Sequence, residues 1–100
     1  VVKGLDPTIY QVITYPNPVA CNGVLNFRIE CDQPEEVLQT TIRMYDLSGK
    51  QVYESQQRGT HAIQWDMNKV NVQPGIYVYQ VIIKTATSDN VSKAGKIIVF

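Results

Sequence analysis

Apolar residues recur at every second position along most of this chain, and this alternation constrains its fold more than any other feature. In one segment, polar residues alternate with Leu25, Phe27, Ile29 and Cys31. Because successive side chains of a β-strand point to opposite faces, such a segment is typical of a strand with one buried face. No window of a dozen residues carries the 3.6-residue repeat of an amphipathic helix. We therefore expect an all-β fold.

Turn residues separate the alternating segments. Asp46-Leu47-Ser48-Gly49 has aspartate at the first and glycine at the fourth position of a type I turn, which predicts a hairpin. Pro74-Gly75 introduces a segment that is apolar on both faces except at Gln80, as in a central strand. The predicted strands cover residues 9–15, 25–31, 40–45, 51–54, 61–65, 76–83 and 96–100. About seven strands in this length are the pattern of an immunoglobulin-like β-sandwich.

Composition narrows the function classes. Nine basic residues balance nine acidic ones, and a neutral domain lacks the electrostatic footprint of a nucleic-acid binder. No apolar run is long enough to span a bilayer. We expect one domain over residues 1–100, with any linker from a preceding domain inside residues 1–14. The chain starts at Val1 without a leader, and we interpret it as a piece of a longer protein.

Residue patterns that carry chemistry are sparse. The single histidine, His61, shares a strand face with Ile63 and Trp65, so we interpret it as a partly buried, hydrogen-bonded residue. Paired histidines, Cys-x-x-Cys spacings and acidic loops with a glycine are absent, so no metal site is predicted. Asp46 and Asp66 lie beside turn residues, where a capping carboxylate explains both. We predict no catalytic, metal or cofactor-binding residues.

The two cysteines flank a predicted strand. An extended ten-residue separation spans roughly 33 Å, whereas a disulfide requires Cα atoms within about 7 Å. Cys21 and Cys31 are therefore predicted not to be bonded to each other, and Cys31 is interpreted as a small buried hydrophobe. A nucleophilic pair of His61 with either cysteine stays open as an alternative.

Aromatic residues offer a second alternative, a carbohydrate-binding face. Rings on several strands could stack on sugars, although core and cross-strand packing explain the same pattern. The residues concerned are Tyr45, Tyr53, Trp65, Tyr77 and Tyr79.

An ordered set of motifs resembles the C-terminal sorting domain of type IX secretion, found at the end of many exported proteins of certain Gram-negative bacteria. The set covers the chain from about Tyr15 to Phe100. It comprises Tyr15-Pro16-Asn17-Pro18, the strand with Phe27, Met44 to Tyr53, Ile63 to Asp66, Pro74 to Tyr79, and Lys93 with Lys96-Ile97-Ile98-Val99. No single motif is specific for this family, but the order and spacing of the whole set match it over nearly the whole chain.

The resemblance implies a non-catalytic module that directs an upstream passenger through the periplasm to the outer-membrane surface or the extracellular space. Its implied partners are proteins of the type IX translocon and attachment complex. The last strand is hydrophobic to its end, which predicts that it is packed or bound. The residues expected to be recognised are Gly75, Tyr77, Lys93, Lys96, Ile97, Ile98, Val99 and Phe100.

Two further interpretations of the domain's function follow from resemblances to known proteins. The connection around Pro34 and the loop before Lys93 are similar to those of the domain carried by the type IX sortase, a gingipain-like cysteine peptidase, which implies a retained docking module. The hook-capping protein of flagella has a similar Tyr-Asp-Leu-x-Gly turn, which implies a structural spacer or cap instead.

Overall fold

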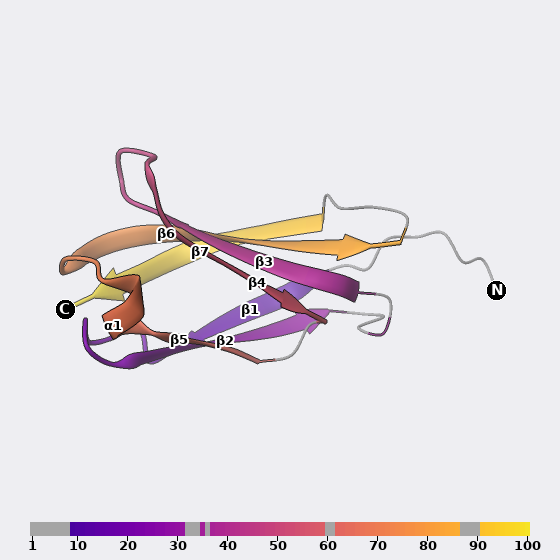
Figure 1. Ribbon diagram of the computed structural model, residues 1–100, viewed down its shortest axis with the longest axis horizontal. Coiled ribbons are helices and arrows are strands. Elements are labelled where there is room, and N and C mark those ends of the chain that lie inside the picture. The colour runs from indigo at the N-terminus through magenta and orange to yellow at the C-terminus, as the bar shows by residue number, and fades with distance from the viewer. Residues whose placement is uncertain (1–8, 32–34, 36, 60–61, 87–90) are drawn as a thin grey trace.

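The computed structural model describes residues 9–31, 35, 37–59, 62–86 and 91–100, and in these it contains seven strands and one short helix (Figure 1). One antiparallel sheet has the order β1-β2-β5 and consists of β1 (Ile9–Tyr15), β2 (Val24–Cys31) and β5 (Ile63–Asp66). The other has the order β4-β3-β6-β7 and consists of β3 (Val37–Tyr45), β4 (Gln51–Arg58), β6 (Gly75–Thr85) and β7 (Val91–Val99).

The two sheets pack face to face, and the predicted alternation decides which side chains lie between them (Figure 1). Leu25 and Phe27 of β2 are buried opposite residues of the larger sheet such as Ile42, Val81 and Ile97. The residues between these positions face outward. The prediction of an immunoglobulin-like β-sandwich is confirmed, and β6 is a central strand, as its apolar character on both faces indicates.

The β3–β4 hairpin is closed by the predicted turn. Asp46 Oδ1 accepts hydrogen bonds from Ser48 N (2.9 Å), Ser48 Oγ (2.6 Å) and Lys50 N (3.0 Å). Gly49 has φ +90°, a conformation that glycine adopts without strain. The interpretation of Asp46 as a turn-capping residue is therefore confirmed.

The Asp46 turn makes the stability of the fold depend on pH. Hydrogen bonds from Ser48 and Lys50 favour the carboxylate and lower the pKa of Asp46. The unfolded chain takes up the proton at a higher pH than the folded chain. The contribution of the Asp46 carboxylate to the free energy of unfolding is therefore fully present above the pKa that Asp46 has in the unfolded chain, near 4. It is lost as the pH falls through the lower pKa that Asp46 has in the folded chain. We expect the difference in melting temperature between wild type and Asp46→Asn to shrink from pH 6 to pH 3. A difference that stays constant over that range would contradict this account.

A single helical turn follows β5 and was not predicted. Helix α1 (Met67–Val70) begins after Asp66, whose Oδ1 accepts a hydrogen bond from Asn68 N at 3.0 Å. It ends at Asn71 in the left-handed conformation, with φ +55°. Met67 and Val70 are buried. Two apolar residues in one turn are too few to form a helical repeat, so the sequence predicted only the capping role of Asp66.

Several predictions fall at the limits of the described residues. Cys21 is exposed and free, which confirms that it is not bonded to Cys31. Cys31 ends β2, but its side chain lies outside the described set. His61, Pro34 and residues 1–8 also lie outside it, so the interpretation of His61, its pairing with a cysteine and the position of a linker stay predictions.

Candidate functional site

The residues predicted for recognition lie on the β6–β7 hairpin, and most of them meet at one end of it. The antiparallel register pairs Gly75 with Val99, Tyr77 with Ile97 and Val78 with Lys96. Phe100 follows directly after β7. Lys93 lies three residues before Lys96, or about 10 Å along the strand, and pairs with Val81. The structure therefore assembles all of the predicted residues except Lys93 at the same end.

The two faces of β7 divide these residues by role. Tyr77, Ile97 and Val99 are buried in the core, where they stabilise the hairpin. Lys96, Ile98 and Phe100 are exposed on the outer face. Because side chains alternate along a strand, Lys93 points to the opposite face from Lys96. The two lysines therefore do not form one continuous surface.

The outer face carries an apolar patch with one cation. Ile76, Val78 and Ile98 are 44%, 38% and 37% exposed, and Phe100 is 65% exposed. Ile76 pairs with Ile98, and Lys96 pairs with Val78. We call Ile76, Val78, Lys96, Ile98 and Phe100 the outer patch. Contiguous apolar surface of this kind marks interaction sites. Ile76 and Val78 were missed as site residues, although apolar residues on both faces of the predicted strand were the available signal.

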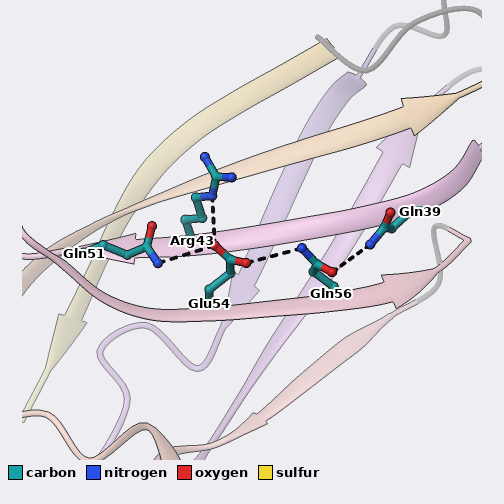
Figure 2. Close-up of polar contacts among 5 residues, drawn as sticks. All are labelled: Gln39, Arg43, Gln51, Glu54 and Gln56. Carbon is teal, nitrogen blue, oxygen red and sulfur yellow. Dashed lines mark hydrogen bonds and ion pairs between the residues drawn. The ribbon is translucent and has the colours of Figure 1, made fainter.

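On the same face, polar side chains of β3 and β4 form hydrogen bonds with one another. Figure 2 shows Glu54 at the centre of a row of side chains on β3 and β4. Its carboxylate accepts from Arg43 Nε (3.1 Å), Gln51 Nε2 (3.4 Å) and Gln56 Nε2 (3.3 Å), and Gln39 Nε2 donates to Gln56 Oε1 at 2.9 Å. Hydrogen bonds with Tyr45 and Glu54 raise the pKa of Arg43.

Lys96 differs from Arg43, because it forms no ion pair with any residue of the described part of the chain. Arg43 has the carboxylate of Glu54 beside it, whereas the side chain opposite Lys96 on β6 is apolar. The outer patch therefore combines exposed apolar side chains with a cation that has no ion-pair partner among the described residues.

The two glycines of the β6–β7 pair differ in whether an added Cβ would fit. A Cβ added to Gly75 would lie 3.8 Å from the Tyr77 ring, an ordinary contact, and Gly75 does not adopt positive φ. Gly75 therefore does not require the absence of a Cβ. That requirement falls instead on Gly95, where a Cβ would lie 2.6 Å from Cε2 of Tyr79.

A segment before β2 covers the outer edge of β7. Asn17 Nδ2 donates to Lys96 O, and Asn17 Oδ1 accepts from Ile98 N, both at 2.9 Å. Val19 N then donates to Ile98 O at 2.8 Å, and Phe100 N donates to Val19 O at 2.9 Å. Near the turn that precedes β6, Tyr77 Oη donates to Gln73 O at 2.5 Å. Backbone and side-chain bonds thus hold the last strand on both sides.

Four of the five aromatic residues considered for a sugar-binding face, all except Tyr45, lie in the core or pack against it. The Trp65 ring lies 4.7 Å from Phe27 and 4.8 Å from Tyr53 in edge-on contacts, and Trp65 Nε1 donates to Ser55 Oγ at 2.8 Å. Trp65, Tyr77 and Tyr79 are buried, so these three cannot stack on a sugar from solvent. The core interpretation of these rings is the correct one.

Neither a metal-ligating cluster nor a helix that could span a membrane occurs within the described residues. Among them, no three of histidine, cysteine, aspartate and glutamate lie close enough to hold a metal ion. Within the same part of the chain, no helix has the length and apolar character needed to cross a membrane.

The fold and the outer patch define an immunoglobulin-like domain whose last hairpin carries its distinctive surface. The sequence model of one family, described as the secretion system C-terminal sorting domain, matches residues 13–99. The chain therefore belongs to this family of type IX secretion sorting domains, and the resemblance seen in the sequence is confirmed. A search of curated proteins finds no match.

Three solved structures contain similar domains. PorU of Porphyromonas gingivalis, described as dimeric and latent, is 30% identical with a TM-score of 0.75, and the match covers 99% of this chain and 10% of PorU. A β-glucuronidase of Parabacteroides merdae is 15% identical with a TM-score of 0.63, and the match covers 93% of this chain and 14% of the glucuronidase. PorZ of P. gingivalis, a surface component of the type IX system, is 22% identical with a TM-score of 0.57, and the match covers 89% of this chain and 11% of PorZ. The last two similarities show the fold alone. The chain spans about a tenth of PorU and PorZ and a seventh of the glucuronidase.

Proposed function

We propose that this domain is a non-catalytic sorting and docking module that carries an upstream passenger across the periplasm and outer membrane through proteins of the type IX translocon and attachment complex. The match to the sorting-domain family over residues 13–99 supports the proposal. The outer patch adds a surface on which such a protein could dock. Ile76, Val78, Ile98 and Phe100 would contact an apolar surface, and Lys96 would pair with a carboxylate of the partner.

The experiment fuses the full chain to a secreted reporter in a host with type IX secretion. Deletion of Lys96–Phe100 should abolish surface delivery. Because the deletion also removes the buried Ile97 and Val99, it could act by unfolding the domain. The charge reversal Lys96→Glu avoids this problem. It should change the free energy of unfolding by less than about 0.5 kcal/mol.

Lys96→Glu should lower surface delivery about tenfold, since it places a negative charge against the partner's carboxylate. Lys93→Glu makes the same charge change on the opposite face of β7 and is the matched control. Lys93 is among the residues expected to be recognised, and an equal loss of delivery in both variants would place it on the recognised surface with Lys96. Delivery unchanged by the deletion would rule out the sorting function.

A second candidate is a retained docking module, which the resemblance to the domain carried by the type IX sortase implies. The 30% identity to PorU, a type IX sortase, across 99% of this chain supports it. The mass of the surface-delivered reporter distinguishes a sorting signal that is removed from a docking module that is retained. A signal that is removed gives a reporter about 11 kDa lighter than the fusion, whereas a retained module leaves the mass of the fusion intact.

A further inference from the structure

The Tyr-Pro-Asn-Pro motif leads into a segment whose backbone lies along an otherwise open edge. Strand β7 is the last in the order β4-β3-β6-β7, so its side away from β6 has no further strand of that sheet. An edge strand presents unpaired N–H and C=O groups, which another extended chain can join. Here the segment Asn17–Cys21, which we call the strap, bonds to these groups from Lys96 to Phe100.

Asn17 begins the strap by replacing a peptide group with its side chain. Its amide donates to Lys96 O and accepts from Ile98 N, so one side chain satisfies both outward backbone groups as a neighbouring strand would. Pro16 and Pro18 flank it and have no N–H to offer a ladder. An asparagine between two prolines therefore supplies the donor that the backbone lacks at this point.

Val19 and Cys21 continue the pairing with backbone bonds. Val19 forms a parallel bridge with Val99, and Cys21 N donates to Phe100 O at 2.9 Å. Val19 is fully buried and Val99 nearly so, which anchors the strap in the core. The strap is thus held both by hydrogen bonds along the edge and by apolar packing beneath it.

We propose that the strap determines which surface of β7 a partner can bind. With the strap in place, the edge from Lys96 to Phe100 cannot accept an added strand, whereas the side chains of the outer patch stay accessible. The partner is then a folded protein whose surface offers apolar side chains to the outer patch and one carboxylate to Lys96. It is not an extended peptide that joins the sheet as a further strand. This inference rests on the proposed sorting function and specifies how the last strand is recognised.

A disulfide that locks the strap tests the proposal. Residues paired across neighbouring strands have Cα atoms about 4.8 Å apart, inside the range of about 4.4–6.8 Å that a disulfide spans. Val19→Cys with Val99→Cys, in a chain whose two native cysteines are replaced by serine, should form this bond in the oxidising periplasm. Alkylation and mass measurement of the reporter fusion establish whether the bond is present.

If the partner binds the outer patch with the strap closed, the locked fusion reaches the surface within about twofold of the same fusion with either single cysteine. If the partner adds a strand to the edge, the strap must leave, and the locked fusion fails while both single variants are delivered. That result would overturn the inference and leave the sorting function intact. Delivery that survives deletion of Lys96–Phe100 would instead overturn the sorting function itself.

The role assigned to Asn17 has a separate measurement. In the full chain, Asn17→Ala should speed hydrogen exchange of the Ile98 amide about tenfold, because that N–H loses its acceptor. Asn68→Ala, which removes an exposed amide from α1, is the matched control and should leave the Ile98 amide unchanged. Equal exchange in the two variants would show that Asn17 does not close the edge.

Discussion

Replacement of Phe27 by alanine is expected to lower the free energy of unfolding by about 3–5 kcal/mol, the largest loss from any single truncation proposed here. Phe27 is 0% exposed and joins the two sheets through its ring. The ring lies 4.7 Å from Trp65 on its own sheet and 5.5 Å from Tyr79 on the other, both in edge-on geometry. Alanine would remove both contacts and leave a cavity between the sheets.

Urea denaturation followed by Trp65 fluorescence measures this loss. The free energy of unfolding of a small domain is about 5–15 kcal/mol, so Phe27→Ala could leave the folded state only slightly more stable than the unfolded state. Phe27→Leu keeps most of the volume and should give a smaller loss that can be measured in a folded protein. The matched control is Arg28→Ala, an exposed neighbour on β2, with an expected change within about 0.5 kcal/mol. A loss below about 1 kcal/mol in Phe27→Ala would contradict the bridging role of the ring.

The parts of the fold that could be predicted are those that depend on neighbours in the sequence. Alternation identified the strands because a strand with one buried face needs apolar residues at every second position. The Asp46 turn was predictable because its three hydrogen bonds stay within residues 46–50. The central place of β6 followed from its apolar residues on both faces.

The features that could not be predicted depend on pairing between distant segments. Asn17 is 79 and 81 residues from its partners Lys96 and Ile98, and nothing in the sequence near either end indicates the contact. Strand β7 begins at Val91, five residues before the predicted start, because pairing with β6 continues through a stretch with little apolar alternation. The pairing of Gly95 with Tyr79 could not be predicted for the same reason, because Gly95 lies in that stretch.

The candidate site was predicted in part. The structure brings Tyr77 together with Lys96 to Phe100 at one end of the hairpin, and their recognition stays a prediction. Its division into a buried and an exposed face follows from strand parity alone, and applying that rule to Lys93 would have separated it from Lys96. Which face is buried depends on the other sheet, so the exposure of Ile76 and Val78 required the structure.

Gly95→Ala is expected to destabilise the domain by about 2–3 kcal/mol, although it adds only one methyl group. Gly95 lies directly opposite Tyr79 across the β6–β7 pair. The Tyr79 ring lies over the glycine, so an added Cβ would sit 2.5 Å from Cζ and 2.6 Å from Cε2. An aromatic side chain that covers a cross-strand glycine is a known device for stabilising sheets. Tyr79 is itself buried, which raises its pKa, and it packs on Phe27.

Because Phe27 and the core confine the Tyr79 ring, the ring cannot swing aside without losing its own packing, and the cost of the added methyl should depend on that ring. Gly75→Ala is the control in the same hairpin. Its Cβ would meet the Tyr77 ring at 3.8 Å, so we expect a change within about 0.5 kcal/mol or a slight gain from the stiffer unfolded chain. A double-mutant cycle isolates the clash. With Tyr79→Leu in place, Gly95→Ala should cost about 2 kcal/mol less than in the wild type, measured by urea denaturation. Equal costs in the two backgrounds would mean that the strand, and not the Tyr79 ring, requires glycine at this position.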